Sequence, residues 1–197
     1  MKNSLFLIIF TIIIFGCGKN ETEIIFPEKY FPAYPESWWI YSNGTTVKVD
    51  PGYHLHQYNS DLSSSPTTEV WVPRINEQYV YKYKITQNNN RIPLRELLRE
   101  RVNETWVVDN WQGEEIKRKV EKVDATIILN KKIIKTGDSI FKEVILVIEF
   151  FPDNETVWIS REAYAPDVGL IRRELNLSDT SVVPFIEKEL IDFLINK

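Results

Sequence analysis

The clearest alternation in this sequence is found in the stretch Tyr79-Val80-Tyr81-Lys82-Tyr83-Lys84-Ile85-Thr86. Three tyrosines and an isoleucine fall on one face of this stretch, and the other four residues fall on the opposite face. Successive side chains of a β-strand point to opposite faces, so a period of two over eight residues predicts a half-buried antiparallel strand.

The composition of the whole chain favours the same class of structure. The 24 Ile, 16 Val and 12 Thr residues make 52 of 197 residues β-branched, and 25 more are aromatic. Such residues pack well on pleated sheets, whereas Ala, the strongest helix former, occurs only four times. The composition therefore predicts a mainly β protein with at most one short helix. The net charge of −4, with both signs mixed along the chain, argues against a nucleic-acid partner.

Turn-forming residues divide the remaining chain into strands. Asn43-Gly44 suits a type I′ hairpin turn, in which both central residues need a positive φ. Phe141 to Phe151 is apolar on both faces and is expected to be a central strand. In all, about ten strands at intervals of about ten residues predict a sandwich, a barrel or a curved sheet.

Two segments fit more than one kind of secondary structure. In 91–102 the spacing of the leucines and of Arg101 is helical, so a short helix is plausible there. The segment 114–122, with its continuation to Leu129, also contains apolar residues at helical spacing. The β-branched run Thr126-Ile127-Ile128 favours a long strand, and the change of parity near Val120 would then be a bulge.

The first sixteen residues are expected to be a signal peptide rather than part of the fold. Lys2 supplies a positive start, and the apolar run Leu5 to Phe15 is too short to span a bilayer. The following Ile14-Phe15-Gly16-Cys17 resembles the lipobox of bacterial lipoproteins, in which the Cys is acylated and becomes the first residue. Cys17 is the only Cys in the chain, so lipidation also explains an otherwise unpaired thiol. Acyl chains on Cys17 would anchor the protein to a membrane without spanning it.

Residues 17–35 are expected to form a lipidated, flexible tether, and residues 36–197 a single antiparallel β domain. Three Phe-Pro or Tyr-Pro pairs between Phe26 and Pro35 interrupt regular structure in the tether. The stretch Gly18 to Glu23, a Lys followed by acidic residues, resembles the export signal of surface lipoproteins in Bacteroidetes. That resemblance implies an outer-membrane protein and slightly favours the cell surface over the periplasmic face.

Three further segments, in order along the chain, resemble a Bacteroidetes lipoprotein family of unknown function. They are Tyr30-Phe31-Pro32 with Ser37-Trp38-Trp39-Ile40-Tyr41, then Thr136 to Val144, and then Tyr164 to Glu174, which are similar to "YFP…WxY", "AGtFkdv" and "YAPGVGLVKxE" respectively. Asp167 departs from the usual Gly of the third segment. The resemblance implies a strongly curved antiparallel sheet, an incomplete barrel like the lipoprotein carriers LolA and LolB. It brings no catalytic residue.

The candidate ligand-lining residues are aromatic: Tyr79, Tyr81, Tyr83, Trp106 and Trp158. They could line a hollow for an acyl chain, form a platform for sugar rings, or fill the concave side of a curved sheet. Pro166 and Gly169 are assigned to a tight structural turn, with Gly169 free to adopt a conformation closed to other residues.

No segment carries a recognisable catalytic or metal motif. His54 and His56 share a strand face, but two imidazoles make no closed metal site. The basic runs around Arg95 and around Arg118 alternate with glutamates and are interpreted as salt-bridged surface. We therefore expect a monomeric, non-enzymatic binding or accessory module without cofactor, whose partner is an envelope protein or an apolar small ligand. The alternative is a carrier of a lipid or acyl ligand.

Overall fold

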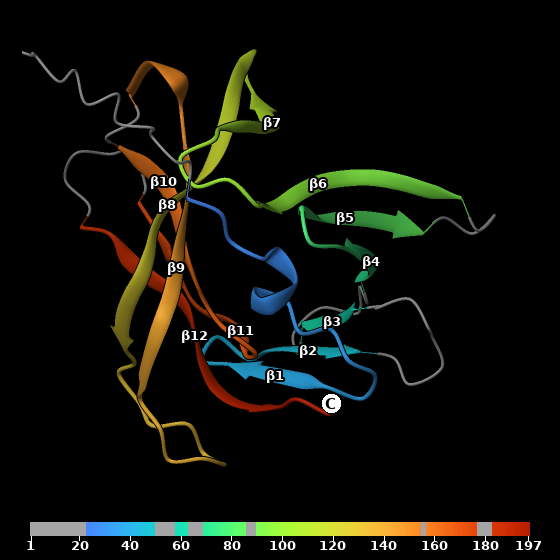
Figure 1. Cartoon of the computed structure of the whole chain (residues 1–197), viewed down its shortest axis with the longest axis vertical. Helices are drawn as coiled ribbons and strands as arrows, with labels where there is room; N and C mark the ends of the chain where they lie inside the picture. Colours follow the sequence, from blue (N-terminus) through green and yellow to red (C-terminus); the bar gives the residue numbers. More distant parts are fainter. Residues whose placement is uncertain (1–22, 50–57, 63–68, 86–89, 155–156, 177–182) are drawn as a thin grey trace, which may run out of the picture.

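The fold is mainly β, as the sequence predicts (Figure 1). The structure, a computed structural model, describes residues 23–49, 58–62, 69–85, 90–154, 157–176 and 183–197. Its strands are β1 (Trp38–Tyr41), β2 (Thr45–Val49), β3 (Tyr58–Leu62), β4 (Glu69–Ile75), β5 (Tyr79–Ile85), β6 (Arg91–Arg99), β7 (Trp106–Trp111), β8 (Glu114–Ile128), β9 (Ile140–Phe150), β10 (Trp158–Ala165), β11 (Gly169–Leu175) and β12 (Phe185–Leu194).

The twelve strands form one curved antiparallel sheet, two strands more than the sequence predicts. Its order is β6-β5-β4-β3-β2-β1-β12-β11-β10-β9-β8-β7. Each of the described strands pairs with the next strand along the chain, except that β6 does not pair with β7. In addition, β1 pairs with β12 and so joins an N-terminal half of the sheet to a C-terminal half. Strands β6 and β7 lie at opposite edges, and no ladder joins them in the described part of the chain. The sheet is therefore an open one.

The segment before β1 packs into the concave side of the sheet instead of forming a tether. Ile25, Tyr30, Phe31 and Ala33 are buried and belong to the hydrophobic core. The segment includes the 3₁₀ turn η1 (Pro27–Tyr30), which contacts both β5 and β11. Figure 1 shows it in blue between the two halves of the sheet.

The prediction of a flexible tether is consequently wrong for residues 23–35. Prolines prevent regular structure there but not burial, and an irregular segment can still place large apolar side chains in a hollow. Backbone hydrogen bonds hold it: the Ile25 N–H donates to the Glu100 carbonyl at 2.7 Å, and the Asp167 N–H donates to the Lys29 carbonyl at 2.7 Å.

Both ambiguous segments are strands. In 91–102, where a short helix was plausible, β6 pairs along its length with β5, and Val80 lies opposite Leu98. Both of these side chains are fully buried, so pairing with a neighbouring strand outweighs the helical spacing of the leucines. Strand β8 is the long strand that the β-branched residues favour, and its register shifts between Val120 and Lys122, which confirms the expected bulge.

The turn at Asn43-Gly44 is of a different type from the one predicted. Gly44 has a positive φ of 85°, but Asn43 does not have a positive φ. The Gly44 N–H donates to the Tyr41 carbonyl at 3.0 Å, and the Asn43 side chain accepts a hydrogen bond from the Thr45 N–H at 3.0 Å. This arrangement fits a turn over Ser42 and Asn43 followed by a glycine with positive φ.

The turn from Pro166 to Gly169 joins β10 to β11. Gly169 has φ of 94°, and Asp167 has φ of 58°. A Cβ on Gly169 would lie 3.5 Å from Pro32 Cδ and 3.6 Å from Trp39 Nε1, so space remains but the backbone conformation disfavours other residues. The N-terminal segment and Trp39 therefore pack against this turn.

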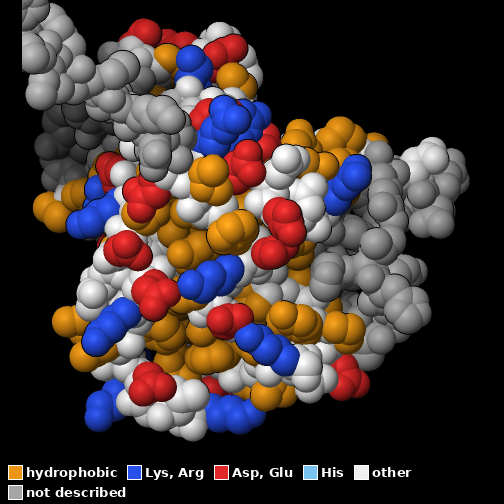
Figure 2. Space-filling model, in the orientation of Figure 1, with side chains coloured by type: hydrophobic (Ala, Val, Ile, Leu, Met, Phe, Trp, Pro, Cys, Tyr) orange, Lys and Arg blue, Asp and Glu red, His pale blue; other side chains and the backbone are white. Residues whose placement is uncertain are grey.

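No helix in the described ranges has the length and apolar character needed to cross a membrane. The 3₁₀ turns η1 and η2 (Pro152–Asn154) are the helical elements of that part of the chain. On the face drawn in Figure 2, basic and acidic side chains are interspersed with hydrophobic ones, as the mixed sequence predicts.

Candidate functional site

A pocket of about 210 Å³ lies on the concave side of the sheet, where the two halves face each other. The N-terminal half contributes β1, β2, β5 and β6, the C-terminal half contributes β10, β11 and β12, and the segment before β1 contributes Phe31 and Pro32. Segments from both ends of the chain therefore build one site.

Aromatic rings form one wall of this pocket. Trp39 and Tyr41 are two residues apart on β1, so both point to its buried face. The Trp39 Nε1–H donates to the Val168 carbonyl at 2.6 Å, and the Tyr41 hydroxyl donates to the Leu170 carbonyl at 3.0 Å. Burial raises the pKa of Tyr41, so it stays neutral. Because the polar atoms of both side chains are already bonded to backbone, their rings present an apolar surface.

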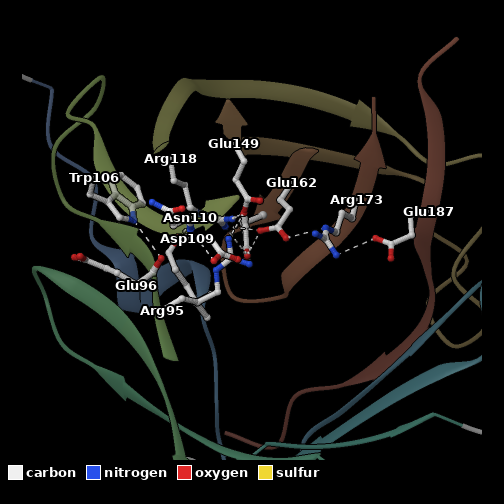
Figure 3. Close-up of polar contacts among 12 residues, drawn as sticks. Arg95, Glu96, Trp106, Asp109, Asn110, Arg118, Glu149, Glu162, Arg173 and Glu187 are labelled. Carbon is white, nitrogen blue, oxygen red and sulfur yellow. Dashed lines mark hydrogen bonds and ion pairs between the residues drawn. The ribbon is translucent and has the colours of Figure 1, made fainter. Parts of the chain in front are cut away.

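A buried guanidinium lies beneath the pocket. Arg118 on β8 is 1% exposed, and its Nε donates to the Leu97 carbonyl at 2.8 Å. Its two terminal nitrogens donate to Glu149 on β9 and to Glu162 on β10 (Figure 3). Arg118 thus links three strands of the C-terminal half to β6 of the N-terminal half.

The Glu162 carboxylate of this network remains charged. Burial raises the pKa of Glu162, but Arg118 and Arg173 outweigh that effect and hold the pKa well below its usual range. The Tyr164 hydroxyl also donates to Glu162 at 2.7 Å. On the other side of the network Arg95 donates to Glu149 at 2.6 Å. Figure 3 shows the chain of contacts continuing from Glu162 through Arg173 to Glu187.

Cations dominate the charged lining of the pocket. Four cationic side chains and one carboxylate line it: Lys82, Arg95, Arg173, Lys188 and Glu162. The cations come in two cross-strand pairs. Lys82 of β5 lies opposite Arg95 of β6, and Arg173 of β11 lies opposite Lys188 of β12. Each half of the sheet therefore presents one pair of like charges to the pocket.

The residues expected at a ligand site lie elsewhere. Val80 and Lys82 face the core and the pocket, so Tyr79, Tyr81 and Tyr83 lie on the outer face of β5, half-buried against one another. Trp106 is buried and donates to the Glu96 carbonyl at 3.1 Å, and Trp158 stacks on Arg161. None of these five residues is among those that line this pocket.

Sequence reasoning missed the charged residues of the site. The sequence predicts that Arg118 and Arg95 belong to a salt-bridged surface, but Arg118 is buried and Arg95 lines the pocket. A signal was present: Arg118 lies two residues from Ile116 and two from Val120, so it shares their inward face. Glu149 likewise interrupts the apolar run of β9. The pairing of Arg99 with Glu96, by contrast, follows the sequence expectation.

The predicted lipidation site and the two histidines cannot be compared with the pocket. Cys17, His54 and His56 lie outside the described residues. Within the described ranges, no group of three or more His, Cys, Asp or Glu side chains could hold a metal ion.

Comparison with known proteins adds no relative. No protein-family model, no curated protein and no solved structure matches this chain.

Proposed function

We propose that this protein is a non-enzymatic binding module that acylated Cys17 holds at the bacterial outer membrane. The observation that supports a binding function is the pocket, which is lined by the rings of Trp39 and Tyr41 and by four cationic side chains. Concave sites with apolar walls and a few convergent polar groups are the usual places where small molecules bind. The lipid anchor, the surface location and a monomeric state are taken from the sequence.

The charged network supports binding rather than catalysis. A general acid or base works best with a pKa near the operating pH, whereas the pKa of Glu162 is moved downward, away from neutrality. Glu149 and Glu162 each face two arginines, and such pairing fixes side chains in place. The network therefore supports a ligand site with fixed side chains at its base.

The size of the pocket favours a small ligand over a whole lipid. Its volume of about 210 Å³ is below the roughly 300–1,000 Å³ of pockets for drug-sized ligands. The segment before β1 already occupies much of the concave side, where a carrier would need a continuous apolar hollow. A LolA/LolB-like carrier of an acyl ligand is the second candidate. The buried Phe31 and Pro32 argue against it, because they fill space that an acyl chain would need.

Changing Cys17 to Ser should release the protein from the membrane fraction and leave its fold intact, because the acyl chains are the proposed anchor. Fractionation of cells and immunoblotting measure the distribution, and circular dichroism of the released chain checks the fold. Ser42→Ala, an exposed change far from the anchor in sequence, is the control and should stay with membranes. A Cys17→Ser protein that still sediments with membranes would contradict the lipid anchor.

Binding itself can be measured on the soluble Cys17→Ser form with three ring compounds of similar size, benzoate, benzyl alcohol and benzylamine. At least one should bind saturably in calorimetry. Leu170→Trp should abolish that binding because an indole would fill the pocket, which Leu170 lines. Val107→Trp, at a 50% exposed position of β7, is the matched control. If no probe binds, or if Leu170→Trp binds like the parent, the binding function fails.

A further inference from the structure

We infer that the pocket takes a small organic carboxylate, with its anionic head between Lys188 and the Lys82–Arg95 pair and its apolar part against the rings of Trp39 and Tyr41. The inference rests on the proposed binding function and adds the chemical class of the ligand. Three features of the described residues carry it: like charges in direct opposition, a half-buried ammonium without a carboxylate partner, and donors without acceptors.

The lining of the pocket contains two cross-strand pairs of like charge. Directly opposed like charges on neighbouring strands destabilise a sheet. Here Lys82 opposes Arg95 on one wall, and Arg173 opposes Lys188 on the other. The arginines of these pairs already have carboxylate partners: Arg95 pairs with Glu149, and Arg173 pairs with Glu162 and Glu187. Arg118 shares Glu149 and Glu162 with them. An anion in the pocket would lie among all four cations and would offset their repulsion.

Lys188 differs from the two arginines of the lining, because it has no carboxylate partner among the described residues. Its Nζ lies 5.0 Å from the centre of the Tyr41 ring, and within the described part of the chain it forms neither a hydrogen bond nor an ion pair. Burial lowers its pKa, and the neighbouring Arg173 and Lys82 lower it further, against the attraction of Glu162 and Glu187. A bound carboxylate would stabilise the protonated ammonium that this environment disfavours.

Unused donors lie in the same place. The Nε–H groups of Arg95 and Arg173 are buried, and neither finds an acceptor with hydrogen-bond geometry among the described residues, although Arg173 Nε lies 3.2 Å from Glu162 Oε1. Buried donors of this kind are normally satisfied, so a pair of them beside a pocket indicates that an acceptor can enter. A carboxylate offers two oxygens as acceptors.

The size of the pocket and its aromatic wall determine which apolar group the carboxylate ligand can carry. A dry cavity of about 150 Å³ accommodates benzene, so this pocket of about 210 Å³ has room for one ring and a carboxylate. The aromatic wall disfavours an ion that is hydrated on all sides, such as inorganic phosphate. The surplus of cations over carboxylates in the lining suits an anion.

The test compares benzoate, benzyl alcohol and inorganic phosphate by calorimetry on the soluble Cys17→Ser protein. Benzoate should bind about 10- to 100-fold more tightly than benzyl alcohol, as hydrogen bonds to charged groups allow. Lys188→Met should remove this preference while benzyl alcohol still binds. Lys188→Gln is the second variant should the Met variant not fold. Lys135→Met removes another lysine that stacks on a ring, that of Trp38, outside the pocket, and should change nothing.

The outcomes separate this inference from the proposed function. Equal binding of benzoate and benzyl alcohol would overturn the carboxylate class and leave the binding module standing. A benzoate preference that survives in both Lys188 variants would place the anion elsewhere and overturn the site. Competition by phosphate at benzoate concentrations would show that charge alone is recognised, which also overturns it. Absence of binding by every probe would remove the proposed function as well.

Discussion

Replacing Arg118 by Met should destabilise the folded protein by about 3–5 kcal/mol, the usual cost of removing one partner from a buried ion pair. Arg118 is 1% exposed and donates to Glu149, to Glu162 and to the Leu97 carbonyl. Without it, two buried carboxylates lose a shared counter-charge and a buried carbonyl loses its donor. Urea unfolding of the soluble Cys17→Ser form, followed by circular dichroism, measures the change in the free energy of unfolding.

Two further variants show whether the effect comes from burial and from the shape of the guanidinium. Arg99→Met breaks ion pairs with Glu96 and Glu104, but the Arg99 side chain is 33% exposed, so a loss of at most about 1 kcal/mol is expected. Arg118→Lys keeps the charge, but its single nitrogen cannot reach the three separate acceptors that the three nitrogens of the guanidinium reach. The stability of this variant should therefore fall between those of the parent and Arg118→Met. Equal losses for Arg118→Met and Arg99→Met would refute the structural role of the buried network.

Removing residues 23–35 should cost several kcal/mol and leave little of the folded state. The segment buries Ile25, Tyr30 and Phe31, and each such side chain contributes about 1.5–3 kcal/mol when fully buried. Their sum is comparable with the whole stability of a typical domain, about 5–15 kcal/mol. A chain beginning at residue 36 should therefore show early urea unfolding or rapid proteolysis.

The control is a chain beginning at residue 23, which retains the segment and all of its described contacts. It should unfold at the same urea concentration as the soluble parent. Phe31→Ala in that chain should reproduce part of the loss, about 3–5 kcal/mol. If the chains beginning at 23 and at 36 unfold together, the segment is not part of the core and the domain begins where the sequence suggested.

The fold class could be predicted because it depends on local patterns. The alternation at Tyr79 to Thr86 predicts β5, and the β-branched residues of 114–129 favour the long strand β8 with its bulge. A period of two requires only that a strand have two different faces. The same pattern does not say which face is inside: the size of the tyrosines predicts that they line the concave side, whereas Val80 and Lys82 face inward.

The site could not be predicted because its residues are far apart in sequence. Lys82 and Arg95 meet on neighbouring strands, but Arg173 and Lys188 reach the same pocket only through the pairing of β1 with β12 and the curvature of the sheet. In sequence, Arg118 belongs to a run of alternating charges that is typical of a solvated strand. Its burial depends on Glu149 and Glu162, which lie 31 and 44 residues away.

The sequence by itself determined the class of structure, the strands with strong alternation, the bulge in β8 and the turn that ends at Gly169. Each of these follows from the conformational preferences of adjacent residues. The tertiary structure decided which segments are buried: Ile25 to Ala33 fill the hollow, and a cationic pocket forms beside them. Burial depends on which distant surfaces come together, and a chain that breaks regular structure with prolines can still supply the side chains that fill the space between them.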